Sequence, residues 1–265
     1  MANTSYPKGA QKLLGAAVNL LTDTIKVALV PSAYTFSTAH EFVSDLGARV
    51  GTDQALTNKT ITGGVFDADD PDFGALAPGN TVKAFVIYKD TGNTSTSPLL
   101  FYFDTAVGLP FSTNGGGLVI PWDNGVKKIA RLNLPVYPKG GEKMLSGAVN
   151  FLTDTLALVA LPTSYVYDPA HEFLSGLGAL VGTAVTLTNK TITGGVFDAD
   201  DVDLGAIASG SNIGSLAIIK DTGTAGTSPV LLHLTDVTGF PMATSGSAIS
   251  VRWSAGSAKI FSLVA

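Results

Sequence analysis

An internal repeat constrains this chain of 265 residues more than any other feature. The segment NKTITGGVFDADD at residues 58–70 returns letter for letter at residues 189–201, 131 positions later. The same shift aligns the whole chain without a gap and places Tyr6 on Tyr137. The sequence therefore predicts one module used twice, at residues 1–132 and 133–265. Each copy is long enough to bury a core of its own.

Composition indicates an ordered globular protein. Hydrophobic residues make up 45% of the chain and charged residues only 14%, which excludes a disordered segment as its main component. The apolar runs, such as residues 82–88 and 157–161, are shorter than the roughly 18 residues that a membrane-spanning helix requires. The N-terminal residues lack a charged segment followed by an apolar one, so no secretory signal is predicted. We expect a protein made in the cytoplasm, with no membrane partner.

Charge and cysteine content exclude further classes of function. The net charge is −5, and the pair Lys127 and Lys128 is the longest run of cations. A nucleic-acid partner is not expected, because a basic patch is missing. The absence of cysteine excludes disulfides and thiolate metal sites. No cofactor is predicted.

The pattern of apolar and turn-forming residues predicts an all-β fold for each copy. Runs rich in β-branched and aromatic residues alternate with clusters of Gly, Asn, Asp and Pro, as in β-sandwiches and barrels. We expect two homologous β-sandwich or jelly-roll-like domains in tandem. The runs at 85–88 and 99–103 lack alternation, which predicts central strands covered on both faces, whereas Pro121 predicts an edge. In the first copy, strands are expected at 24–30, 54–61, 64–68, 81–90, 97–104, 117–122 and 127–132.

One or two short helices are expected in each copy. Leu14, Ala17, Val18 and Leu21 recur at helical spacing and predict a helix near the N-terminus. Residues 37–48 predict a second helix of two turns, with Ser37 or Thr38 as its N-cap and Gly47 as its end.

Two groups of residues invite a chemical role. His40 and His171 each precede a glutamate, as a general base or metal ligand would require, but no second ligand is spaced to join them, so a structural histidine is the favoured interpretation. The Asp-rich segments at residues 67–72 and 198–203 could bind Ca²⁺, yet they lack the glycine and closing glutamate of an EF-hand. Turn formation through their carboxylates is the favoured alternative.

Motifs of known enzymes are missing. The patterns of a nucleophile elbow, a P-loop and a dinucleotide-binding loop do not occur, and the glycine run at residues 114–117 precedes a strand, as in a hairpin. We therefore predict no catalytic residues and no enzyme. The polar segments at residues 89–98 and 220–229 are interpreted as flexible hairpins, with a recognition loop as the alternative.

The differences between the copies predict where a partner binds. The first copy has a net charge of −1 and the second −4, largely through lost cations. The strand expected at residues 24–30 becomes TLALVAL at residues 155–161 of the second copy, with no polar residue left to face water. This change predicts that the other module or a partner subunit covers that strand. Partner contacts are expected in the N-terminal segment and at positions where the copies differ: Tyr6, Lys8, Lys12, Lys26, Arg49, Ala157 and Leu180.

The order of these segments resembles a known family. TDTIKVALV, AHEF with SDLG, LTNKTITGGVFDADD, VIYKDTG with TSPLL and a last strand near a tryptophan are similar to small virion structural proteins of tailed bacteriophages. The resemblance covers nearly all of each copy, whereas the family's usual form is a single module. It implies a capsid decoration or cement protein that binds the lattice of the major capsid protein, self-associates there and stabilises the shell. The implied location is the capsid surface of the virion.

Other functions remain as alternatives. A tail or fibre component built from the same modules would bind a host receptor, and a sugar-binding module would recognise glycans. An enzyme would need a cleft that brings His40 close to Asp69 or Asp70, and the equivalent residues together in the second copy.

Overall fold

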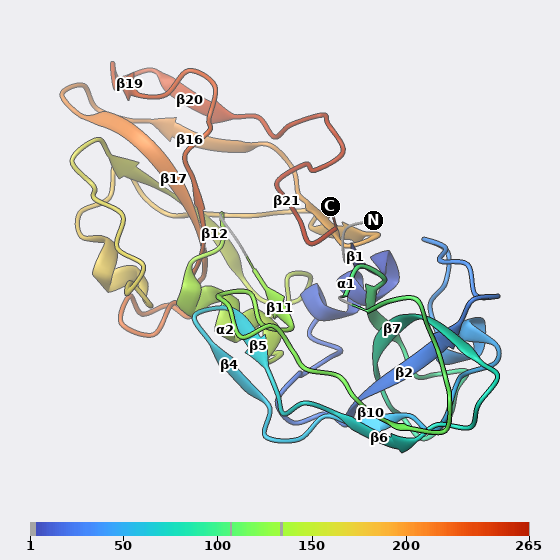
Figure 1. Cartoon of the computed structure of the whole chain (residues 1–265). Helices are drawn as coiled ribbons and strands as arrows, with labels where there is room; N and C mark the ends of the chain where they lie inside the picture. The colour runs from blue at the N-terminus through green and yellow to red at the C-terminus, as the bar shows by residue number, and fades with distance from the viewer. Residues whose placement is uncertain (1–3, 107, 133–134, 265) are drawn as a thin grey trace.

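The computed structural model describes residues 4–106, 108–132 and 135–264 and confirms an all-β fold. Two similar modules lie side by side, with one short helix of each between them (Figure 1). We call residues 1–132 module one and residues 133–265 module two. Residues 133 and 134, within the expected boundary, lie outside the described residues. Neither described helix has the length and apolarity needed to cross a bilayer.

Module one contains a main antiparallel sheet and two small sheets. The main sheet has the order β1-β8-β7-β2-β3, with β9 paired to β7, and the small sheets are β10-β6 and β11-β5-β4. The elements are β1 (Thr4–Ser5), α1 (Pro7–Leu14), β2 (Ile25–Pro31), the 3₁₀ turn η1 (Val43–Leu46), β3 (Gln54–Ala55), β4 (Thr60–Thr62), β5 (Val65–Asp67), β6 (Asp72–Ala75), β7 (Thr81–Lys89), β8 (Leu99–Phe103), β9 (Phe111–Ser112), β10 (Gly117–Val119) and β11 (Ala130–Arg131).

Module two repeats this arrangement, except that an isolated bridge between Val136 and Leu232 takes the place of the pairing of β1 with β8. Its main sheet has the order β13-β12-β17-β18, with β19 paired to β17, and its small sheets are β14-β15-β21 and β16-β20. The elements are α2 (Pro138–Leu145), β12 (Leu156–Pro162), η2 (Leu174–Leu177), β13 (Val185–Thr186), β14 (Thr191–Thr193), β15 (Val196–Asp198), β16 (Val202–Ala206), β17 (Asn212–Lys220), β18 (Val230–Leu234), β19 (Met242–Ala243), β20 (Ala248–Val251) and β21 (Phe261–Ser262).

Each main sheet is covered on both faces, as the missing alternation predicted. In module one, the face that carries Val27 and Ile87 packs against Phe66 of the small sheets. The opposite face, with Ala28 and Val86, packs against Tyr6, which directly precedes α1, and against residues of η1 and the loop before it. All five residues of β8 are buried. A strand covered on both faces has no side that faces water, so polar residues are not needed at alternate positions. This explains its continuous apolar sequence.

The predicted helix at residues 37–48 is wrong. Only η1 forms there, and Phe42 before it is extended, with φ −121° and ψ 162°. The Asp45 carboxylate accepts hydrogen bonds from the backbone N–H groups of Glu41 and Phe42, at 2.8 and 2.9 Å. These bonds stabilise an extended entry into a single turn, and side-chain bonds of this kind compete with an α-helix.

The strand predicted at residues 54–61 is divided in two. Asn58 adopts a left-handed conformation, with φ 47°, and separates β3 from β4. Asparagine tolerates this region better than most residues, so the break is encoded locally. β10 ends at Val119, which leaves Pro121 exposed just beyond it.

The two helices join the modules reciprocally. Leu13 packs into the core of module one, but the next residue, Leu14, packs into the core of module two. Leu145 of α2 does the reverse and packs in module one. Two equivalent backbone bonds accompany the exchange, from the Leu20 N–H to the Leu145 carbonyl and from the Phe151 N–H to the Leu14 carbonyl, at 3.0 and 2.9 Å. The chain therefore has the internal two-fold symmetry of a dimer.

The glycine pair inside the unchanged block lies at this junction. A Cβ atom on Gly195 would be 2.5 Å from the Cβ of Ala10 in the opposite helix, and one on Gly141 of α2 would be 2.9 Å from the Cα of Gly64. The Gly63 N–H donates to Glu142 Oε1 at 2.7 Å. A side chain at Gly195 would therefore push the modules apart. A Cβ atom on Gly64 would lie at ordinary contact distance, 3.5 Å from the Cα of Gly141, and glycine is favoured there by its φ of 74°.

We expect Gly195→Ala to destabilise the protein by loosening the junction. Gly195 has φ 82°, so alanine costs about 1–2 kcal/mol in backbone strain, and the overlap with Ala10 adds about 1–3 kcal/mol. The midpoint and slope of urea unfolding measure the total.

Gly223→Ala is the matched control. Gly223 has φ 81°, but no atom lies within 4 Å of a Cβ placed there. It therefore carries the strain without the overlap. Equal losses of stability in the two variants would show that the turn at Gly195 does not limit how closely the modules pack.

Candidate functional site

Two of the expected contact residues meet in a charged cleft on module one. Lys26 of β2 and Arg49, in the loop after η1, line a cleft of about 780 Å³. The Lys26 ammonium lies 2.6 Å from Asp90 Oδ2, and Arg49 pairs with Asp53. Asp53 also accepts a hydrogen bond of 2.6 Å from the Tyr88 hydroxyl. Each cation thus has a carboxylate within the site.

Burial and charge shift the acidity of two groups in this charged cleft. The Lys26 ammonium, followed by the Gly92 backbone N–H, lowers the pKa of the Asp90 carboxyl below its usual value. Burial and the neighbouring Asp53 carboxylate raise the pKa of Tyr88, so the hydroxyl stays protonated as a donor. The site presents fixed charges and hydrogen-bond donors, as a surface for polar recognition does.

The loop at residues 89–98, interpreted from the sequence as a flexible hairpin, forms one wall of this cleft. Ser97 is buried, and its hydroxyl donates to the Asn93 carbonyl at 2.7 Å and accepts from the Thr91 N–H at 3.0 Å. Backbone bonds from Val43 and Ser44 tie the loop to η1. The loop is therefore hydrogen-bonded throughout, and the same pattern recurs at residues 222–228 of module two.

Module two carries apolar residues at the same positions. Ala157 replaces Lys26 and is 1% exposed, and Leu180 replaces Arg49 and packs on the cluster around Ala157. Ile219 replaces Tyr88 and is buried. The cover over this strand comes from module two's own residues, including Tyr165 and Leu177, whereas the sequence predicted the other module or a partner.

The structure separates the remaining expected contact residues. Tyr6 is fully buried, and its hydroxyl bonds to that of Tyr34 at 2.7 Å, so its side chain is not available to a partner. Lys12 pairs with Glu41 at 3.0 Å, and its ammonium lies 5.4 Å from the centre of the Phe42 ring. Lys8 is exposed on α1. Lys8 and Lys12 lie on α1 and Tyr6 directly precedes it, and none of the three lines the charged cleft.

The two histidines of the HEF segments are hydrogen-bonded, as favoured from the sequence. His40 Nδ1 lies 2.8 Å from the Tyr34 hydroxyl, and His171 Nδ1 lies 3.0 Å from that of Tyr165. Each therefore ends a chain of two tyrosines that begins at Tyr6 or Tyr137. The described residues contain no group of three or more acidic or histidine side chains placed to hold a metal.

His40 and the Asp-rich corner lie on opposite faces of the main sheet. Tyr34, which is hydrogen-bonded to His40, belongs to the cluster on the face of the main sheet that carries Ala28 and Val86. Asp70 accepts a hydrogen bond of 2.8 Å from the backbone of Trp122, which packs on the core of the opposite face. The cleft that an enzyme would require between His40 and Asp70 is therefore not formed in the described structure.

The Asp-rich corner forms turns, the alternative favoured from the sequence. Asp69 Oδ2 accepts from Thr57 Oγ1 and Asn58 Nδ2, at 2.9 and 2.6 Å. Asp72 caps its own turn through the Gly74 N–H at 2.8 Å. The same bonds recur in module two at Asp200 and Asp203. Carboxylates used in this way close the corner between strands.

Sequence reasoning missed Asp53 and Tyr88 as members of the site. The comparison of the copies contained the signal, because both positions also become apolar in module two, as Ala184 and Ile219. Asp53 is lost together with its partner Arg49, whereas the partner of Lys26, Asp90, is kept as Asp221.

Comparison with known proteins adds no family to this geometry. No model of a known protein family matches the chain, and a search of curated proteins finds no relative.

We expect Lys26→Ala to remove pH-dependent stability from module one. Asp90 has a lowered pKa when folded, so its pairing stabilises the protein above the unfolded pKa of about 3.9 and is lost as pH falls through the lower folded value. The variant should lose about 0.5–1 kcal/mol at pH 7. The difference from the unmodified protein should vanish well below pH 4, as urea unfolding at both pH values will show.

Lys127→Ala serves as the control, because Lys127 has no ion pair in the described part of the chain. A loss in Lys26→Ala that is equal at both pH values would contradict a role for the Asp90 charge.

Proposed function

We propose that this chain is a virion structural protein that binds the outer surface of a bacteriophage capsid and stabilises the shell. The observation that carries the proposal is the reciprocal exchange of Leu14 and Leu145, which holds two modules as one body. The resemblance of the repeated segments to phage virion proteins supplies the context.

A rigid pair of modules suits attachment to a regular lattice. Once one module binds, the second is already placed at a fixed spacing, so its binding loses little further freedom of motion. On a lattice of identical subunits this arrangement raises the total affinity when the spacing of the modules matches that of the sites.

The two modules would contact the lattice differently. Module one presents the charged cleft around Lys26 and Arg49, whereas module two is apolar and closed at the corresponding Ala157 and Leu180. We propose that the cleft orients the protein on the shell, because charged groups contribute more to orientation and specificity than to affinity.

A tail or fibre component that binds a sugar or receptor is the second candidate. The observation that favours it is the cleft itself, where Asp53, Tyr88 and the hydroxyl-rich loop at residues 91–97 offer donors and acceptors for sugar hydroxyls. A glycan array with the purified protein tests this candidate, and a Lys26→Ala, Arg49→Ala double variant shows whether the cleft is responsible for any binding.

The capsid proposal predicts that the purified protein raises the thermal stability of bare capsids. A ligand that binds only the assembled shell stabilises it by about 2.7 kcal/mol per site at a concentration of 100 times Kd. Calorimetry of capsids with and without added protein measures the shift.

The double variant at Lys26 and Arg49 is the matched comparison and should need a higher concentration for the same shift. An unchanged capsid melting temperature at saturating protein would exclude the capsid proposal.

A further inference from the structure

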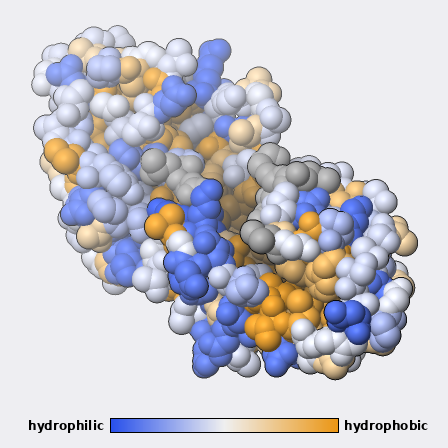
Figure 2. All heavy atoms as spheres, viewed as in Figure 1, coloured by the Kyte–Doolittle hydropathy of each residue, from blue (hydrophilic) through white to orange (hydrophobic). Residues whose placement is uncertain are grey.

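A cavity of about 420 Å³ lies where module one meets module two, in a region where Figure 2 shows a recess between the modules. Its apolar wall includes Leu13, Phe101 and Ile129 of module one and Leu145 and Leu263 of module two. The exchange of helices thus completes the cavity, because Leu145 comes from α2. The lining of the charged cleft shares no residue with it.

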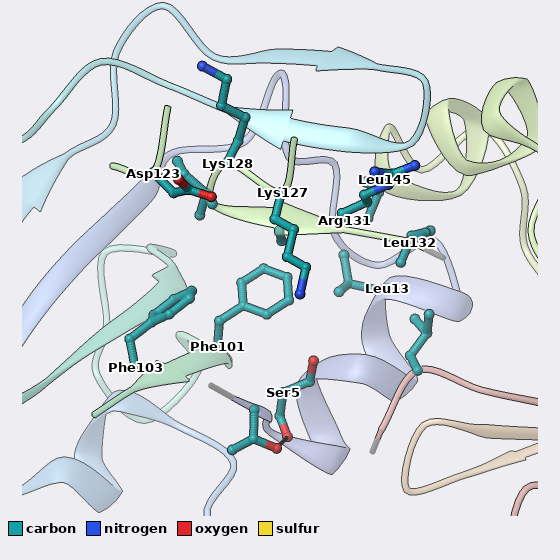
Figure 3. A pocket seen from close by; sticks show the side chains of 14 residues that line it. Ser5, Leu13, Phe101, Phe103, Asp123, Lys127, Lys128, Arg131, Leu132 and Leu145 are labelled. Atoms are coloured by element: carbon teal, nitrogen blue, oxygen red, sulfur yellow. Dashed lines mark hydrogen bonds between the residues drawn. The ribbon is translucent and has the colours of Figure 1, made fainter. Parts of the chain in front are cut away.

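One lysine reaches into this junction cavity. Figure 3 shows the Lys127 side chain directed toward the Phe101 ring, while Lys128 and Arg131 point away. Lys128 pairs with Asp67 at 3.4 Å. Lys127 makes no hydrogen bond or ion pair with any described residue. A cation beside an apolar wall favours a ligand that joins a carboxylate to an apolar group.

Module two fills the corresponding place with its own side chain. Ala130 lines the cavity, and the equivalent residue in module two is Phe261, which is 6% exposed. The Phe261 ring stacks on that of Phe151 at 6.5 Å between centres. Lys127 is likewise replaced, by Ala258. Module one therefore leaves open, beside a cation, a position at which the same fold holds an aromatic ring.

The cavity is also bordered by two strand edges. In the described part of the chain, β1 pairs only with β8, and β11 pairs only with β5. Thr4 and Ser5 of β1 and Ala130 and Arg131 of β11 line opposite sides. An edge strand presents unpaired backbone groups, and an extended peptide satisfies them by adding a strand.

We propose that the junction cavity binds an extended segment of a partner protein that carries a carboxylate two residues after an aromatic side chain, because residues two apart in a strand point to the same side. The aromatic side chain takes the place that Phe261 takes in module two, the carboxylate pairs with Lys127, and the backbone bonds to an open strand edge. The inference concerns the isolated protein and does not depend on the proposed capsid function.

One other occupant of this cavity and one other groove agree less well with these observations. A free amphiphilic acid would satisfy Lys127 and the apolar wall but would leave both strand edges unpaired. A second, largely apolar groove near Phe111 and Trp122 lacks a free cation, because the Lys128 at its margin is paired with Asp67. Nothing in that groove selects one occupant.

The test uses two capped peptides, TVFVDT and TVFVKT, that differ only in the charge two residues after the phenylalanine. Amide NMR titration of the full chain should show TVFVDT shifting Ser5, Ala130 and Arg131, with affinity about fivefold above that of TVFVKT, the effect of one partly screened charge pair. Lys127→Ala, which copies module two, should abolish the difference. Ala130→Phe should prevent binding of both peptides.

Controls separate this site from the other features of the protein. Lys26→Ala lies in the charged cleft and should leave the titration unchanged. If Ala130→Phe does not fold, the exposed Lys127→Ala decides the outcome alone. Equal affinity for the two peptides, a charge preference that survives Lys127→Ala, or saturable binding of decanoate with no shift from TVFVDT would each overturn the proposal. Capsid stabilisation is measured separately, so either proposal can fail without the other.

Discussion

The close contact between each short helix and the opposite module is the constraint on which the rest of the structure depends. α1 and α2 are too short to be stable alone and gain their stability from the cores they enter. Leu14 and Leu145 bury in the module to which they do not belong, and the glycine turns at Gly64 and Gly195 allow the helices to approach. Two modules tied in this way behave as one body, and the junction cavity exists only because Leu145 and Leu263 close one side of it.

The duplication freed the two modules to diverge where they do not touch. The junction needs both glycine turns, so the block that contains them is identical in the two copies. Away from it, module one keeps the pairs Lys26–Asp90 and Arg49–Asp53, while module two replaces Lys26, Arg49 and Asp53 with Ala157, Leu180 and Ala184 and keeps an aspartate, Asp221, in place of Asp90. Where both members of a pair are replaced, as at Arg49 and Asp53, no unpaired charge is left behind.

Much of the fold could be predicted from local patterns, and the errors have local causes. The central strands β7 and β8 follow from runs without alternation. A helix does form near the N-terminus, but α1 ends at Leu14, so Ala17, Val18 and Leu21, whose spacing predicted it, lie beyond its end. The helix expected before Gly47 fails because the Asp45 side chain bonds to two backbone N–H groups and holds Phe42 extended. For the site, Lys26 and Arg49 were identified from copy differences, but Tyr6, the extended residue before α1, is buried against Tyr34 and Tyr102, which are distant in the sequence.

The sequence by itself determined that the chain is one β module used twice, because a repeat and the period of apolar residues are properties of neighbouring positions. It also favoured turns at the Asp-rich corners, where Asp72 bonds to the nearby backbone of Gly74, although Asp70 bonds to the distant backbone of Trp122. Only the tertiary structure decided why Gly64 and Gly195 are kept, and why Lys127 reaches an open cavity while Ala258 does not. Those facts depend on how two modules dock, and contacts between residues far apart in the chain leave no local pattern.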